Sequence, residues 1–217
     1  MRAFYLHGFA SGPSSGKALW LRERFREAGI DLKIPSLVTG EFKDMTISSQ
    51  LEIVTELAGT DEPVTLVGSS MGGYVAALFA NRHPERVNRL ALLAPAFGFP
   101  TRWMNRWPSE DIAAWRRDGE FPVWHHHLDR EERVGYQLVT DGNQYPDFPS
   151  VTVPTLIFHG ARDETVPLKY SEDYTTANPL ARLRVLDSDH SLADVLEPIW
   201  EEMSEFFGLQ AIGGRPF

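Results

Sequence analysis

Residues 64–73 read VTLVGSSMGG, which joins a β-branched apolar run directly to a glycine-rich turn. A run such as VTLVG is typical of a strand buried on both faces of a parallel sheet. The residues that follow, up to Pro84, favour a helix that the proline ends. This stretch therefore predicts a strand, a sharp turn and a helix in direct succession.

Within the turn, residues 68–72 (GSSMG) match the pattern G-x-S-x-G. A sharp strand-to-helix turn strains the backbone of its middle residue, and bulky side chains two positions to either side would clash. Gly68 and Gly72 relieve that clash and leave Ser70 at the carboxyl end of the sheet, beside a helix N-terminus. The competing interpretation is a glycine-rich turn that only packs the helix against the strand. Because the motif lies between a predicted strand and a predicted helix, we favour a turn that exposes Ser70.

Outward from this turn, short apolar runs alternate with longer amphipathic ones. Strands are predicted at 2–6, 64–68, 88–95, 154–160 and 181–187, with a short extended piece at 32–37, and helices at 15–28, 69–83, 46–58, 168–177 and 192–207. The alternation predicts an α/β fold, with a mostly parallel sheet of about six strands and helices on both faces. The tail at 211–217 is expected to be loosely held.

The composition excludes several classes of function. The chain has 217 residues, enough for one globular domain, and a net charge of −9 from 21 basic and 30 acidic side chains. This acidity argues against a nucleic-acid partner, whose phosphates call for a basic face. The chain has no cysteines, so disulfides, cysteine nucleophiles and thiolate zinc sites are excluded.

The chain carries no signal for a membrane. No segment approaches the roughly 20 apolar residues that a membrane-spanning helix needs. The apolar run at residues 3–6 is too short for a signal peptide. A cytoplasmic location is therefore expected, and the oligomeric state stays open.

A serine needs a base to become a nucleophile, and the sequence supplies one together with an acid. Asp163 follows the strand at 154–160, and His190 follows the strand at 181–187. Because functional groups gather at the carboxyl ends of parallel strands, we expect Ser70, Asp163 and His190 to meet there. His190 would accept the Ser70 proton and pass it to the leaving group, while Asp163 fixes the imidazole tautomer.

Other residues compete for these roles. Further candidate acids are Glu164, Asp187, Asp189 and Asp194, and Asp163 itself could be a turn residue. Asp189 adjoins His190, so its side chain is badly placed to reach the ring. His7 and His159 each precede a glycine at a strand end and could be structural, so neither is assigned as the base.

A reaction at a carbonyl also needs donors for the tetrahedral oxyanion. We expect one from the backbone N–H of Met71, directly after Ser70. The second is expected from the loop after the first strand, where the N–H of Phe9 is our choice. The side chains of both residues would then flank the acyl group.

Two motifs resemble sites that the chain is not expected to have. Residues 12–18 (GPSSGKA) resemble a phosphate-binding loop, but three residues instead of four separate its glycines, and Ala18 follows Lys17 where a hydroxyl is required. His125, His126 and His127 are consecutive, so their side chains diverge and cannot readily face one metal. We therefore expect no nucleotide, metal or other cofactor.

Residues 97–150 interrupt the alternation of strand and helix. They hold four of the six tryptophans, Trp103, Trp107, Trp115 and Trp124, in a stretch that prolines cut into short pieces and that shows no clear strand. We expect a helical cap insertion within a single domain spanning 1–217. The tryptophans could form the core of the cap or wall an acyl pocket above Ser70, and we expect both.

Four motifs together resemble the α/β-hydrolase superfamily: YLHGFASGPSSGKA, GSSMGGY, HGARDETVP and DSDHSL. They are most similar to small bacterial YqiA-type esterases, over roughly 1–95 and 151–207. The resemblance implies an α/β-hydrolase fold and a cofactor-free esterase or thioesterase. By position it implies a triad of Ser70, Asp163 and His190 with an oxyanion hole at Phe9 and Met71.

The expected function is hydrolysis of a small carboxylic ester or thioester through an acyl-enzyme on Ser70. One alternative is other chemistry on the same residues, such as C–C bond hydrolysis or peroxyacid formation. Another is a binding protein that kept the fold and lost turnover. The length of the acyl chain and the nature of the leaving group stay open.

Overall fold

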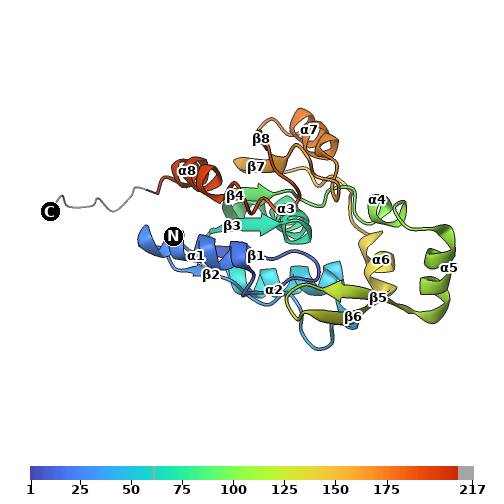
Figure 1. Cartoon of the computed structure of the whole chain (residues 1–217). Coiled ribbons are helices and arrows are strands. Elements are labelled where there is room, and N and C mark those ends of the chain that lie inside the picture. Colours follow the sequence, from blue (N-terminus) through green and yellow to red (C-terminus); the bar gives the residue numbers. More distant parts are fainter. Residues whose placement is uncertain (61, 210–217) are drawn as a thin grey trace.

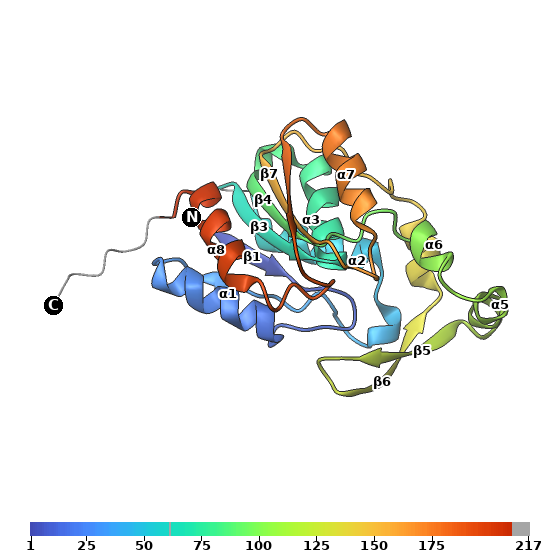
Figure 2. The same cartoon turned by 45° about the horizontal axis from the view of Figure 1, so that its top comes forward.

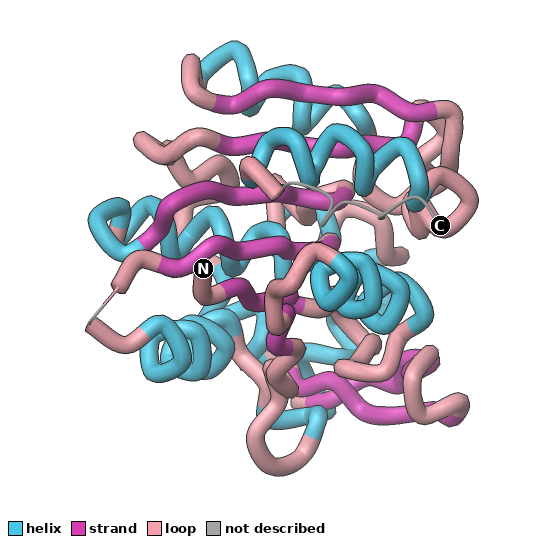
Figure 3. Tube along the Cα trace, turned by 90° about the vertical axis from the view of Figure 1, so that its left-hand side faces the viewer, coloured by secondary structure: helices cyan, strands magenta, loops and turns pink. Residues whose placement is uncertain are grey.

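The computed structural model describes residues 1–60 and 62–209, and within them the main sheet has six parallel strands in the order β2-β1-β3-β4-β7-β8. Figure 3 shows these strands side by side. The strands are β1 (Ala3–Leu6), β2 (Leu32–Lys33), β3 (Val64–Ser69), β4 (Val87–Leu93), β7 (Thr155–Gly160) and β8 (Ala181–Leu186). The predicted parallel α/β sheet is therefore confirmed. The tail at 211–217 lies outside the described residues.

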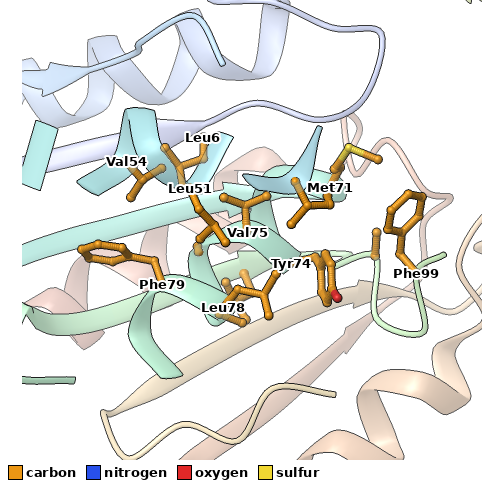
Figure 4. Close-up of a cluster of buried hydrophobic side chains, with 14 of the residues drawn as sticks. Leu6, Leu51, Val54, Met71, Tyr74, Val75, Leu78, Phe79 and Phe99 are labelled. Atoms are coloured by element: carbon orange, nitrogen blue, oxygen red, sulfur yellow. The ribbon is translucent and has the colours of Figure 1, made fainter. Parts of the chain in front are cut away.

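Helices cover both faces of the sheet (Figure 2). On one face lie α1 (Gly16–Glu27) and α8 (Leu196–Phe207), and on the other α2 (Ile47–Ala58), α3 (Met71–Arg82) and α7 (Leu168–Ala177). Figure 4 shows the second layer, where Leu51 of α2 and Val75 of α3 pack against Leu6 of β1. Burial on both faces explains why the inner strands β1, β3 and β7 are buried along their whole length, whereas the edge strand β8 alternates with exposed arginines.

Short elements connect the larger ones. Two 3₁₀ helices, η1 (Phe42–Asp44) and η2 (Pro84–Arg86), precede α2 and β4. Between β4 and β7 the insertion forms α4 (Thr101–Met104), α5 (Ser109–Asp118), β5 (Glu120–His125), β6 (Arg130–Gly135) and α6 (Gln137–Gly142). These elements gather to one side of the sheet (Figure 1).

The insertion contains an antiparallel hairpin, β5–β6, that the sequence analysis did not predict. Pro122 in β5 and the charged run that begins β6 both weaken the usual signals of a strand. The side chains of β5 nevertheless alternate between partly buried and exposed: Phe121 and Val123 are partly buried, while Pro122 and Trp124 are exposed. The hairpin therefore packs one face inward and leaves the other open.

The sheet brings the loops that follow β1 and β3 to one edge. β1 pairs with β2 on one side and with β3 on the other, so the strand order reverses between them. In open α/β sheets, ligands bind at the carboxyl ends of the strands where the order reverses. The sheet topology alone thus points to the loops beginning at His7 and Ser70.

Among the helices of residues 1–60 and 62–209, none combines the length and the apolar character that crossing a membrane requires.

We predict that Gly72→Ala destabilises the fold, because a Cβ at this position would lie 2.2 Å from the Leu6 carbonyl oxygen. A clash between two backbone segments cannot be relieved by a side-chain rotation, so we expect a loss of about 2–3 kcal/mol or more. Urea unfolding measures it. Gly16→Ala is the control, because its Cβ position has no heavy atom of the described residues within 4 Å apart from its chain neighbours and the backbone of its own helix. Equal stability of both variants would contradict the packing.

Candidate active site

Ser70 lies between β3 and α3 in a backbone conformation that L-residues rarely adopt, with φ 52° and ψ −117°. Its N–H donates to the Leu93 carbonyl at 2.9 Å, and its carbonyl accepts from the N–H groups of Ala96 and Tyr74 at 3.0 and 3.1 Å. These bonds hold the strained turn between β4 and α3. As the sequence predicts, glycines make the turn possible, since a Cβ on Gly68 would lie 2.6 Å from the Gly72 carbonyl oxygen.

The structure brings Ser70, His190 and Asp163 together. His190 Nε2 lies 3.1 Å from Ser70 Oγ, and His190 Nδ1 lies 2.7 Å from Asp163 Oδ2. An ionised carboxylate only accepts, so Nδ1–H donates to Asp163 and Nε2 is left to accept the Ser70 hydroxyl proton. The carboxylate is fully buried, whereas the imidazole keeps 25% of its surface exposed.

The Asp163 carboxylate receives several donors. Its Oδ1 accepts the backbone N–H groups of Thr165 and Val166, both at 2.8 Å, and its Oδ2 also lies 3.2 Å from His159 Nε2. Burial alone would raise the pKa of Asp163, but hydrogen bonds from His159 and His190 outweigh it and hold the pKa well below its usual range. The carboxylate is therefore ionised at neutral pH.

His159 is a contact that the sequence analysis missed. It is fully buried, with Nε2 at 2.8 Å from the Val166 carbonyl oxygen and Nδ1 at 2.8 Å from Ser171 Oγ. The ring therefore links the end of β7, the loop after Asp163 and α7. The signal in the sequence was its position four residues before Asp163 across a turn, which brings the two side chains to the same place.

The insertion also holds the loop after Asp163. Arg102 and Arg106 of the α4 region both donate to the Thr165 carbonyl oxygen, each at 2.7 Å. Burial lowers the pKa of Arg102, with a smaller contribution from the charge of Arg106. Sequence reasoning gave no role to either arginine, because their partner is a backbone atom far along the chain.

Within the described residues, none of the competing acids forms a hydrogen bond with the His190 ring. Asp187 is 85% exposed and pairs with Arg162 at 2.8 Å. Asp189 Oδ1 accepts from the N–H and the hydroxyl of Ser191, at 2.8 and 2.6 Å. The Asp194 carboxylate accepts from the Ser188 hydroxyl, and Glu164 is exposed. Of the five carboxyl groups considered, Asp163 has the geometry for a partner of His190.

The N–H groups of Phe9 and Met71 have no hydrogen-bond partner within the described residues. The loop that carries Phe9 is anchored by His7, whose Nδ1 lies 3.0 Å from the Gly8 carbonyl oxygen and whose Nε2 accepts the Leu37 N–H at 3.1 Å. Burial lowers the pKa of His7, which keeps the ring neutral and able to accept that bond. One free donor therefore lies in the loop after β1 and the other at the first residue of α3.

Two cavities meet at Ser70. The first, which we call the aromatic cavity, has a volume of about 610 Å³ and is lined by Trp103, Trp107, Phe121 and Trp124. The second has a volume of about 780 Å³ and extends toward the start of α1. The tryptophans thus divide: three line the aromatic cavity, while Trp115 is buried in the insertion and donates to the Val134 carbonyl oxygen at 2.9 Å.

The three consecutive histidines diverge. His125 packs edge-on against Phe42, His126 lines both cavities at Ser70, and His127 contacts the Ser14 hydroxyl at 3.1 Å. Within the described part of the chain, no group of three or more histidine or carboxylate side chains is arranged to hold a metal.

Comparisons with known proteins agree with this architecture. Residues 2–208 match the model of a family described as Uncharacterised protein family (UPF0227). The mouse alpha/beta hydrolase domain-containing protein 10 superposes with a TM-score of 0.81 at 19% identity, covering 95% of this chain and 89% of that one. This likeness confirms the α/β-hydrolase fold that the sequence motifs predict.

Two curated relatives also match. A pimeloyl-[acyl-carrier protein] methyl ester esterase of Aromatoleum aromaticum is 27% identical over 224 residues, covering 84% of this chain and 87% of that protein. A probable 1-acylglycerol-3-phosphate O-acyltransferase of Oryza sativa subsp. japonica is 44% identical over 52 residues. That second match covers 24% of this chain and 13% of the rice protein.

We predict that Asp163 contributes to the pH dependence of stability. Its depressed pKa means that the ionised carboxylate stabilises the fold above the ordinary aspartate range, and that this stabilisation is lost as the pH falls through the folded-state value. The free energy of unfolding should therefore decline below about pH 4 in the wild type and decline less in Asp163→Asn. Asp187→Asn, at an exposed position, should follow the wild type. Parallel declines in all three would contradict the assignment.

Proposed function

The chain belongs to the Uncharacterised protein family (UPF0227), as its resemblance to YqiA-type esterases predicts, and on that premise we propose that it hydrolyses a carboxylic ester or thioester. Ser70 is the proposed nucleophile, His190 the base and Asp163 the acid. The observation that carries the proposal is the continuous hydrogen-bonded path from Ser70 Oγ through His190 to Asp163, at 3.1 and 2.7 Å.

The proposed reaction has two halves. Ser70 Oγ attacks the carbonyl carbon while its proton passes to His190 Nε2, and the N–H groups of Phe9 and Met71 stabilise the oxyanion. His190 then gives the proton to the leaving alcohol or thiol as the C–O or C–S bond breaks. Water, deprotonated by His190, then attacks the acyl carbon. The bond from that carbon to Ser70 Oγ breaks, the proton passes from His190 back to Ser70 Oγ, and the acid is released.

The surroundings of Asp163 suit this role. Because the carboxylate is ionised and buried, it stabilises the positive charge that His190 carries after taking the proton. His159, Thr165 and Val166 hold it in place, so the imidazole keeps the orientation that the proton transfer requires. The curated esterase relative adds support for hydrolase activity.

We further propose that residues 97–150 cap the site and that the aromatic cavity binds the acyl chain. Tryptophan and phenylalanine side chains line the cavity, and it opens on Ser70 and His190. Apolar walls bind a chain by burial, worth about 0.8 kcal/mol per methylene. Chain length should therefore raise specificity until the cavity is filled.

Replacing Ser70 with alanine is expected to abolish esterase activity while leaving the fold intact. Removing the nucleophile of such a site costs about 10⁴-fold or more in turnover. Hydrolysis of p-nitrophenyl butyrate, with circular dichroism as the check of folding, measures the effect. Ser69→Ala is the matched control and should keep its activity. An inactive Ser69→Ala beside an active Ser70→Ala would place the nucleophile one residue earlier.

Activity should fall toward acidic pH, because the base must be unprotonated to accept the Ser70 proton. The pH–rate profile of kcat/KM measures this. At neutral pH, Asp163→Asn should lose about 10³- to 10⁴-fold, since the amide can hold the ring in the wrong tautomer. Asp187→Asn and Asp189→Asn should stay near the wild type. A flat profile between pH 5 and 8 would remove histidine from the reaction.

The tryptophans should separate into two groups by their effects. Trp107→Ala and Trp124→Ala, at positions that line the aromatic cavity, should shift the preferred acyl length in kcat/KM across p-nitrophenyl esters. Trp115→Ala should instead lower the free energy of unfolding by about 3–5 kcal/mol, because this side chain is buried. If the profile of chain lengths is the same in all variants, the aromatic cavity does not bind the acyl chain.

A further inference from the structure

The second cavity at Ser70 differs in character from the aromatic one. It runs from Ser70 and His190 to the first turn of α1, where Ser15 and Lys17 contribute to its lining. The lining of the aromatic cavity, by contrast, contains no lysine or arginine among the described residues. An ester bound at Ser70 extends in two directions, so its two halves meet different surroundings.

Lys17 lies in the stretch that resembles a phosphate-binding loop and does not match it. The side chain is half-buried, and its Nζ donates to the carbonyl oxygen of Ser191 at 2.7 Å. Ser191 directly follows His190 in the chain. An ammonium group has three donors, and this carbonyl is its one hydrogen-bond acceptor within the described residues. Donors therefore remain for a ligand in the cavity.

The charge of Lys17 is incompletely compensated. Burial lowers its pKa to about 8, although the charges of Asp189 and Asp163 act to raise it. A cation that has lost water without gaining full compensation is stabilised by a further anion or acceptor. Lys17 is thus a side chain whose surroundings favour the binding of a negatively charged group.

The other charged groups of this cavity are engaged elsewhere or exposed. Asp189 Oδ1 accepts two hydrogen bonds from Ser191, and Arg162 pairs with Asp187. Glu164, the remaining carboxylate of the lining, is exposed. Lys17 is therefore the charged side chain best placed to recognise a ligand beside the base.

We infer that Lys17 selects substrates whose leaving group carries an anionic oxygen group, a carboxylate or a phosphate. This inference rests on the proposed hydrolysis at Ser70 and on the acyl chain occupying the aromatic cavity. The leaving alcohol or thiol then lies in the second cavity, where the carboxylate or phosphate that it carries accepts hydrogen bonds from Lys17 Nζ. Lys17 is a specificity-determining residue and takes no part in the proton transfer.

The test compares esters that differ in one charge. para-Butanoyloxybenzoate and para-butanoyloxybenzamide share an acyl group and a ring and differ in the anion on the leaving group. In Lys17→Met, the ratio of kcat/KM for the anionic ester to that for the neutral one should fall about 10-fold, the usual effect of losing a charged hydrogen bond. para-Butanoyloxyphenyl phosphate is the third substrate, and the larger dependence on Lys17 identifies carboxylate or phosphate as the better ligand.

The controls separate recognition from structure. Lys17→Arg keeps the charge and should keep the ratio within about 3-fold, and Lys33→Met removes an exposed charge and should leave it unchanged. If Lys17→Met lowers kcat/KM equally for both esters, the inference is overturned, and Lys17 acts by holding the loop that carries His190. If the ratio of kcat/KM for the anionic ester to that for the neutral one is unchanged in Lys17→Met, and the neutral ester is still hydrolysed, the inference is overturned while the proposed function stands. A wild type that hydrolyses none of the esters overturns the proposed function itself.

Discussion

The left-handed backbone of Ser70 is the constraint on which the rest of the site depends. A residue with a Cβ at φ 52° is strained, and the strain persists only because the surrounding structure enforces it. Hydrogen bonds to Leu93 and Ala96 fix the turn to the end of β4 and the loop that follows it. The missing side chains at Gly68 and Gly72 let α3 approach β1 and β3. The hydroxyl is thereby held above the sheet edge, within reach of His190.

The insertion and the site are mechanically joined. Arg102 and Arg106 bind the carbonyl of Thr165, whose N–H in turn binds Asp163. The orientation of the carboxylate therefore depends on α4 as well as on the sheet. A displacement of the insertion would therefore reach the Asp163 carboxylate through these bonds.

Patterns within short stretches of sequence predicted those features that depend on neighbouring residues, such as strands and helices. The strands, most helices and the grouping of Ser70, Asp163 and His190 follow from apolar periodicity and from the rule that functional groups gather at the carboxyl ends of parallel strands. The hairpin β5–β6 was missed because Pro122 and a charged run mask its alternation. The contact of Arg102 with the Thr165 carbonyl depends on how separate elements pack, which no short motif encodes. The contact of His159 with Asp163 is local, since four residues separate the two, but the sequence alone does not distinguish it from a structural histidine.

The most direct measurement is the mass of the protein after incubation with a fluorophosphonate, followed by peptide mapping of the modified residue. Such a probe reacts with a serine that a neighbouring base has activated. The proposed role of Ser70 predicts one phosphonyl group per chain, carried by Ser70, with loss of esterase activity in proportion to labelling. Labelling of a different residue, or full labelling of Ser70 with undiminished turnover, would contradict it.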